Sequence, residues 1–344
     1  MILLVVPKLD KNDARFGFLH RWCEEFALRA ESVVVIADVI GETDMPANAR
    51  AWSCGGEKGR GWLRRLWKFW ELFSFYYARS DAVLFYDAPR RVVAAAPFLL
   101  ALKKMSALWY AGQITLAVRL AERFVYFVFT VSDKSFRLRS KKVIAVGHAI
   151  DIDVFRPVSD RPQSDTLRLL TVSRIAPVSD IETVIAAAAA LKDILRRKWT
   201  LTIAGYPSYR RDEKYLEALE KFVDKKNLHD RVQFLWPSAP SELPRIYNEH
   251  DIFLSMSKGA DTDTAVFEAM SSGLTVISAG EQYKSTLPAP YFLEHRKPAF
   301  LAHRIAELAD DPWPNAALRK IAVERFDVKK GIEKMWGMLK TSKE

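Results

Sequence analysis

Short apolar runs alternate with amphipathic stretches along the first half of the chain. The run Ile2–Val6 predicts a buried strand, and helical patterns follow at Leu19–Arg29 and Val92–Lys103. Strands that alternate with helices are typical of parallel sheets with crossover helices. The other strands predicted in this half are Val33–Ile36, Ala82–Phe85, Leu108–Ala111, Phe127–Thr130 and Val143–Val146.

The same alternation begins again after the turn-rich segment Asp153–Asp165, which we interpret as a linker. Ser241 is expected to cap a short helix that tolerates Pro244 in its first turn. The chain ends in an amphipathic helical pattern at Lys329–Leu339. The predicted strands are Leu167–Val172, Leu201–Ile203, Val232–Leu235, Ile252–Leu254 and Thr275–Ile277, and the predicted helices are Ile181–Leu195, Glu213–Lys225 and Thr264–Met270. The α/β pattern therefore predicts two doubly wound, Rossmann-like domains, with ligands in the cleft that they face.

Composition narrows the class of protein. The 344 residues are 49% hydrophobic and 27% charged, as in globular proteins with a sizeable core. No segment reaches the roughly 18–20 apolar residues of a membrane span, and Met1–Pro7 lacks the basic region of a signal peptide, so we expect a first strand there. Cys23 and Cys54 are too few for a disulfide framework or a cysteine zinc site, which fits a reducing cytoplasm.

The net charge of +10 indicates which binding partners suit the chain, but says little about its fold. It suits phosphate-bearing substrates, an anionic membrane surface or nucleic acid. Because no zinc finger, RNP-type aromatic run or basic leucine zipper accompanies the charge, nucleic acid is the least favoured partner.

The strongest chemical signal is Asp251–Ser257 followed by Phe267–Ile277. A strand ends in small polar residues, and a helix that carries Glu268 follows after a loop. This arrangement places a helix N-terminus at the carboxyl edge of a sheet, where anions bind. Glu268 would face that crevice and accept hydrogen bonds from a ribose; the alternative is a solvated helix carboxylate.

Several stretches, in the same order, resemble family-4 retaining glycosyltransferases. The resemblance is most specific in the second half and looser before residue 100. Leu170–Pro177 resembles the donor-phosphate loop of that family, and Phe267–Met270 resembles the end of its Glu-x7-Glu motif. The other similar stretches are Asp13–Phe18, Gly147–Asp151 with Phe155–Pro157, Leu201–Gly205 and Val232–Leu235.

The resemblance implies the GT-B architecture and transfer of a sugar from a nucleotide diphosphate donor, with retention and without an essential metal or other cofactor. It implies an acceptor domain at 1–155, a donor domain at 156–325 and a C-terminal helix at 326–344 that packs back on the first domain. Arg174 would stabilise the leaving diphosphate. Glu268 would bind the ribose, and the backbone near Leu235–Ser238 would hold the base, with Trp236 either stacking on it or packing. The expected donor-binding residues are Gly17, Ser173, Gly205, Leu235, Trp236, Asp263, Thr264, Ala265 and Glu268.

Several positions depart from the family pattern. Ser179 stands where the family has a second cation, and Ala260 replaces the first glutamate of the motif. On the acceptor side Tyr86 and Gly112 stand where histidines are common, while His148 is retained as a candidate. Lys258, Asp261 and Asp263 are nearby substitutes, and Lys258 joins Arg174 and Ser179 as a catalytic candidate. Asp261-Thr-Asp263 also permits a metal-site interpretation, but two carboxylates are a minimal signal and we expect no metal.

An aromatic and basic helix is predicted at 61–77. On a helical wheel Trp62, Leu66, Phe69, Trp70, Phe73 and Tyr77 share one face, with Arg64, Arg65, Lys68 and Glu71 opposite. Such a helix can lie in a membrane interface. Packing on the first sheet is the preferred interpretation, because that sheet needs covering helices.

Two functions are consistent with these patterns. The first is a cytoplasmic glycosyltransferase, peripheral at the inner face of the membrane, that acts on an envelope, polysaccharide or lipid-linked acceptor. The second is a catalytically impaired GT-B protein that binds a nucleotide sugar or a partner without turnover. The substitutions at Ser179, Ala260 and Gly112 separate them.

Overall fold

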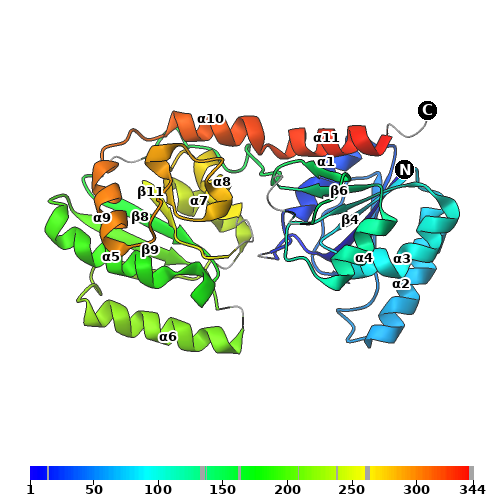
Figure 1. Cartoon of the computed structure of the whole chain (residues 1–344), viewed down its shortest axis with the longest axis horizontal. Helices are drawn as coiled ribbons and strands as arrows, with labels where there is room; N and C mark the ends of the chain where they lie inside the picture. Colours follow the sequence, from blue (N-terminus) through cyan, green and yellow to red (C-terminus); the bar gives the residue numbers. More distant parts are fainter. Residues whose placement is uncertain are drawn as a thin grey trace. The chain divides into compact units, whose positions relative to one another are not determined.

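A computed structural model describes residues 1–13, 15–131, 136, 138–161, 164–207, 209–237, 239–259 and 264–340. The chain divides into two compact units (Figure 1). One comprises Met1–Asp151 with Asp327–Glu344, and the other Ile152–Phe326. Each unit is built on its own parallel sheet, so the predicted fold class of two Rossmann-like α/β domains is confirmed.

The first unit contains a seven-stranded parallel sheet in the order β3-β2-β1-β4-β5-β6-β7. Strand order reverses between β1 and β4, the position at which doubly wound sheets bind ligands. The strands are β1 (Ile2–Leu9), β2 (Val33–Ile40), β3 (Ala49–Ser53), β4 (Ala82–Tyr86), β5 (Met105–Trp109), β6 (Phe127–Thr130) and β7 (Val143–Ala145). The helices are α1 (Leu19–Ala27), α2 (Trp62–Tyr77), α3 (Pro89–Leu102), α4 (Leu116–Phe124) and α11 (Val328–Lys340).

Helices cover both faces of this sheet (Figure 1). Because side chains alternate along a strand, Ile2 and Leu4 of β1 join the core under α1 and α11, while Leu3 and Val5 join the core under α2, α3 and α4. A strand buried on both faces reads as a continuous apolar run, as Ile2–Val6 does. The terminal helix α11 contacts α1 and completes the first of these two cores.

Helix α2 packs on the sheet through Phe69, Phe73 and Tyr77, which are fully buried. The preferred interpretation of this segment is therefore confirmed for these residues. The helical wheel was wrong to place Trp62 on the packed face: its side chain is 67% exposed, because it lies at the first position of the helix, where the core beneath α2 has ended.

The second unit contains a five-stranded parallel sheet in the order β10-β9-β8-β11-β12, with the reversal between β8 and β11. Helices α5 and α9 contact each other over one face, and α8 contacts β11 and β12. The strands are β8 (Leu167–Val172), β9 (Trp199–Ala204), β10 (Val232–Leu235), β11 (Ile252–Ser255) and β12 (Thr275–Ser278). The helices are α5 (Ile181–Ile194), α6 (Arg210–Lys225), α7 (Leu243–Asn248), α8 (Thr264–Ser271), α9 (Pro298–Glu307) and α10 (Ala316–Arg325).

Several elements differ from the sequence-based expectation. Strand β3 was not predicted because it lies at the sheet edge and buries little of its surface. Helices α4, α9 and α10 were also not predicted. Ser241 does not cap α7: it lies within a 3-10 turn, and the capping interaction there runs from the amide of Ala239 to the carboxylate of Glu242 at 3.1 Å.

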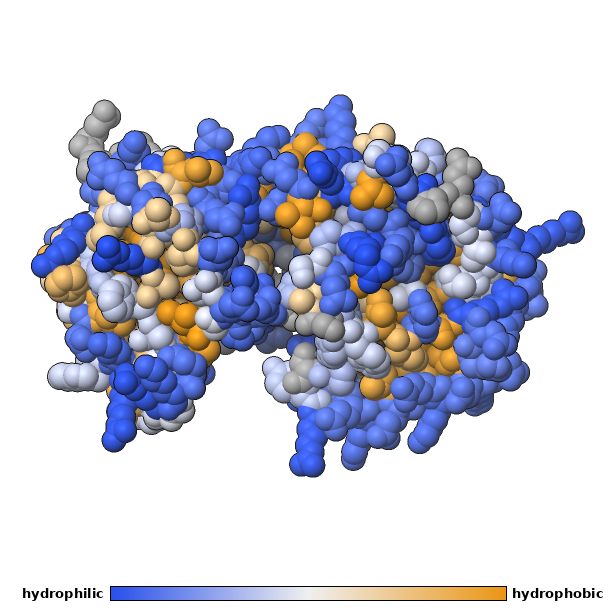
Figure 2. Space-filling view, turned by 180° about the vertical axis from the view of Figure 1, so that it is seen from behind, coloured by the Kyte–Doolittle hydropathy of each residue, from blue (hydrophilic) through white to orange (hydrophobic). Residues whose placement is uncertain are grey.

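Hydrophilic side chains cover most of the face drawn in Figure 2, with hydrophobic groups in patches between them. Within the described ranges, no helix combines the length and the apolar character that crossing a membrane requires.

Candidate functional site

The loop that follows β8 lies beside the reversal point of the second sheet. The guanidinium of Arg174 is exposed there and forms no ion pair with any other residue that the structure describes. The hydroxyl of Ser179 donates a 2.6 Å hydrogen bond to the carbonyl of Arg174, which closes the loop. Ser173 turns a buried hydroxyl inward, for which the described residues offer no hydrogen-bond partner. The loop therefore exposes the Arg174 guanidinium, and the hydrogen bond from Ser179 fixes the backbone that carries it.

Lys258, which follows β11 on the other side of the reversal point, reaches the same loop. Its amide donates to the carbonyl of Val178 at 2.8 Å, and its ammonium forms a 2.9 Å ion pair with Asp180. Asp180 is buried and has a left-handed backbone (φ 54°) between the 3-10 turn Pro177–Ser179 and helix α5. The structure thus places an ammonium on Asp180, the residue that follows Ser179, at which the sequence lacks the expected second cation.

Gly205, directly after β9, allows the neighbouring loops to approach each other. Its φ is +147°, and a Cβ built on it would lie 1.8 Å from the carbonyl oxygen of Ser173. Its amide donates to the carbonyl of Leu235 at 3.1 Å. No other residue type fits here, so the glycine sets the distance between the ends of β8, β9 and β10.

Two neighbouring, partly exposed aromatic side chains follow the ends of β9 and β10. Tyr206 and Trp236 are 43% and 40% exposed, and their ring centroids are 5.7 Å apart. The tyrosine hydroxyl donates to the carbonyl of Pro237. Trp236 also stacks on Phe234 at 6.3 Å, so it packs on one side and leaves part of its ring available. Both alternatives considered for Trp236 are compatible with this geometry.

Glu268 lies on α8 and is partly buried. The hydroxyl of Tyr247, which is fully buried on α7, donates to one of its carboxylate oxygens at 2.9 Å. A carboxylate held from the protein interior is not the solvated helix residue of the alternative interpretation. Thr264 and Ala265 begin the same helix, while Ala260, Asp261 and Asp263 lie outside the described residues.

The acceptor-side candidates of the first unit lie near one another in a predominantly aromatic cluster. Tyr86 ends β4 and stacks on Trp109 with centroids 4.6 Å apart, and the His148 ring lies 6.3 Å from the same tryptophan. Burial raises the pKa of Tyr86 and lowers that of His148 to about 3, so both groups are neutral near pH 7. Gly112 follows β5, and a Cβ on it would lie 2.9 Å from the hydroxyl oxygen of Tyr110.

Gly17 belongs to the loop after β1, at the reversal point of the first sheet. A Cβ on it would lie 2.8 Å from the carbonyl oxygen of Asp13. The Asp13 carboxylate accepts from Lys8 at 2.7 Å and from two loop amides. Burial works against ionisation of Asp13, but these hydrogen bonds outweigh it and lower its pKa. The loop is thus an ordered turn around one carboxylate.

The candidate residues consequently fall into two groups, one in each unit. In the second unit the ends of parallel strands bring Arg174, Ser179, Lys258 and Ser173 to one edge of the sheet. Sequence reasoning missed Asp180, Tyr206 and Tyr247, because their roles depend on contacts with residues distant in the chain. Among the described residues, no cluster of three or more His, Cys, Asp or Glu side chains could hold a metal ion.

Comparisons with known proteins agree with this arrangement. Residues 156–325 match the family described as Glycosyl transferases group 1. The second domain belongs to this family. Over 135 residues the chain is 32% identical to an α-monoglucosyldiacylglycerol synthase of Streptococcus pneumoniae, an overlap that covers 37% of this chain and 29% of that protein. The chain spans about a third of the length of the curated relatives it matches.

Solved structures extend the likeness to the whole fold. The crystal structure of Anabaena HepE in complex with UDP and glucose superposes with a TM-score of 0.77 at 15% identity, over 98% of this chain and 99% of that one. Sucrose-phosphate synthase from Thermosynechococcus elongatus gives a TM-score of 0.76 at 17% identity, over 98% and 97%. These similarities show that the group 1 domain and the first domain together have the GT-B fold. That the two domains face one cleft stays a prediction.

Proposed function

We propose that the chain is a glycosyltransferase that moves a sugar from a nucleotide diphosphate sugar to an envelope, polysaccharide or lipid-linked acceptor. Transfer would proceed with retention at the anomeric carbon and without a metal ion or other cofactor, in the cytoplasm at the inner face of the membrane. The observation that carries the proposal is the presence of two cations at the reversal point of the group 1 domain. One is the guanidinium of Arg174, which forms no ion pair with any described residue, and the other is the ammonium of Lys258.

The proposed chemistry follows from where charge develops. When the bond between the sugar and the diphosphate breaks, negative charge grows on the leaving diphosphate. Arg174 would bind this charge with two or more N–H groups, and Lys258 would add a second cation from the opposite loop. Because both groups are attached to short, hydrogen-bonded loops, little reorganisation is needed as the charge appears.

The remaining candidates would position the donor. The Glu268 carboxylate would accept hydrogen bonds from ribose hydroxyls, with Tyr247 holding it in one orientation. The exposed part of Trp236, with Tyr206 beside it, offers a surface on which a nucleobase can stack. Gly205 lets the backbones of Ser173 and Leu235 approach each other closely, and the diphosphate would lie against the sheet edge that these three residues form. Gly17, in the first domain, stays a predicted donor contact.

Calorimetry with UDP and GDP on the full chain tests the donor site. Arg174→Ala should weaken binding of the preferred nucleotide about tenfold to a hundredfold, since a hydrogen bond to a charged group contributes about 1.5–3 kcal/mol. Glu268→Gln should weaken UDP more than inorganic diphosphate, because it removes a contact to the ribose only. Arg196→Ala, at an exposed arginine two residues beyond the end of α5, is the control and should bind like wild type.

Hydrolysis of the matching nucleotide sugar then separates turnover from binding. Nucleotide binding that depends on Arg174, without hydrolysis or transfer from any UDP-, GDP- or ADP-sugar, would assign the catalytically impaired alternative instead. If Arg174→Ala and Arg196→Ala bind nucleotide equally well, the donor site is placed wrongly.

A further inference from the structure

Helix α2 presents a second apolar surface besides the one that packs on the sheet. Trp62, Leu63 and Trp67 are 67%, 62% and 72% exposed, in a class of residue that is normally buried. Neither indole N–H meets a hydrogen-bond partner among the residues described. Trp70 shows the contrast: its indole N–H donates to the carbonyl of Ala94 on α3 at 2.8 Å, so it is held by the fold.

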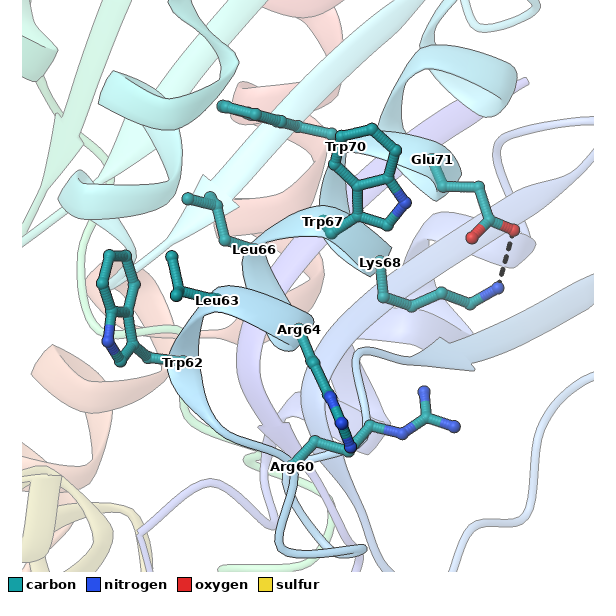
Figure 3. Close-up of a pocket in the computed structure, with 9 residues that line it drawn as sticks. All are labelled: Arg60, Trp62, Leu63, Arg64, Leu66, Trp67, Lys68, Trp70 and Glu71. Carbon is teal, nitrogen blue, oxygen red and sulfur yellow. Dashed lines mark hydrogen bonds and ion pairs between the residues drawn. The ribbon is translucent and has the colours of Figure 1, made fainter.

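Cations line the same surface. Arg60, Arg64 and Lys68 share a groove of about 850 Å³ with the exposed tryptophans. Figure 3 shows Arg60, Arg64 and Lys68 along one side of the helix, with Trp62 and Leu63 on the other. Glu71 is the one carboxylate that lines the groove, and its partner is Lys68 at 2.7 Å. Arg60 and Arg64 form no ion pair within the described part of the chain, so the surface is cationic.

We propose that this tryptophan and arginine surface of α2 binds an anionic lipid membrane. The exposed indoles would lie at the level of the headgroups, where an apolar ring with a free N–H is most stable. Arg60 and Arg64 would pair with lipid phosphates and gain from the negative potential of the leaflet. The inference deepens the proposed function by giving its acceptor a location, but it depends on no residue of the donor site.

The positive charge of this surface favours an anionic membrane over a second copy of this chain as its partner. A symmetric dimer places the same patch of both subunits face to face, which would bring the unpartnered arginines together. Like charges at such an interface are unfavourable. An anionic membrane instead satisfies the cations and the indoles at once.

Vesicle co-sedimentation of the full chain tests the proposal. Vesicles of phosphatidylcholine alone are compared with vesicles that also contain phosphatidylglycerol. We expect binding to the anionic vesicles that weakens as salt is added, and little binding to neutral ones. The double variant Trp62→Ser/Trp67→Ser should lower the partition coefficient by about tenfold or more, because each exposed indole would no longer be removed from water.

A second variant isolates the charges. Arg60→Glu/Arg64→Glu should lower the partition coefficient by about 25-fold or more, given roughly fivefold for each basic residue near an anionic surface. The matched controls are Leu28→Ser, which changes a side chain 77% exposed at the end of α1, and Arg196→Glu. Both controls should bind vesicles like wild type. All four proteins should melt like wild type, since the altered side chains are exposed.

Several outcomes would overturn the proposal. Absence of vesicle binding, equal binding to neutral and anionic vesicles, or an equal loss in the controls would each do so. A dimer, detected by light scattering without lipid and abolished by Trp62→Ser/Trp67→Ser, would assign the surface to a second copy. Vesicle binding that persists in a protein without nucleotide affinity would remove the proposed function and leave this inference standing.

Discussion

Lys258 allows a sharp test of how the donor site replaces the missing cation. The perturbation is Lys258→Met, which keeps the length of the side chain and removes its charge. Lys258 is 54% exposed and lies 2.9 Å from Asp180, next to Ser179. If its ammonium contacts the donor diphosphate, the substitution should weaken the binding of UDP or GDP.

The expected loss of nucleotide affinity depends on how exposed the Lys258 side chain is. A hydrogen bond from a charged donor contributes about 1.5–3 kcal/mol. Because half of this side chain remains in water and part of its charge is shared with Asp180, the lower end applies, and the dissociation constant should rise about tenfold. The effect should shrink as salt is added.

The assay is calorimetric titration of the nucleotide into a double-mutant cycle. Ser179→Lys should tighten binding, and by more in the Lys258→Met background than in wild type, because there it supplies the only cation at this position. Ser179→Ala measures the cost of losing the 2.6 Å hydrogen bond to the Arg174 carbonyl. Lys284→Met is the matched control: Lys284 is 49% exposed and pairs with Glu294 at 3.1 Å.

Two results would refute this reasoning. One is an equal affinity of Lys258→Met and Lys284→Met for the nucleotide. The other is additivity of Ser179→Lys and Lys258→Met, which would mean that the two cations do not act at one place. Lys258→Met leaves the buried Asp180 carboxylate without its cation, so melting curves without nucleotide must confirm that the fold persists. Lys258→Arg, which keeps the charge, should retain most of the affinity.

Two further predictions concern stability. Gly205→Ala should lower the free energy of unfolding of the second domain by more than about 3 kcal/mol, because its Cβ would overlap the Ser173 carbonyl at a φ of +147°; a melting temperature unchanged from wild type would contradict this. His148 titrates near pH 6.5 when unfolded but only at about 3 when folded, so the unfolded chain binds the extra proton between these values and stability should fall with decreasing pH, by up to about 1.4 kcal/mol per unit. Denaturant titrations from pH 7 to pH 4 should show a shallower loss for His148→Gln, and equal slopes would contradict the assignment.

Local pattern was sufficient for the architecture and for part of the site. The strand at Ile2–Val6 is apolar throughout because both of its faces are covered, and that property is visible in the sequence. Residues that directly follow such strands must lie at the carboxyl edge of a parallel sheet. The order of residues along the chain was therefore enough to place Arg174 and Gly205 at one edge.

Tertiary structure alone decided the contacts that give these residues their chemistry. Lys258 and Asp180 are paired because β8 and β11 are neighbours in the sheet, although their loops are far apart in the chain. Tyr247 holds Glu268 because the fold brings a side chain of α7 within hydrogen-bond distance of one on α8, 21 residues further along the chain. Periodicity reports which side of an element is apolar, but not where the packing beneath it ends. For that reason the sequence determined that α2 is an amphipathic helix, and only the fold showed that Trp62 and Trp67 remain in water while Phe69 and Phe73 are buried.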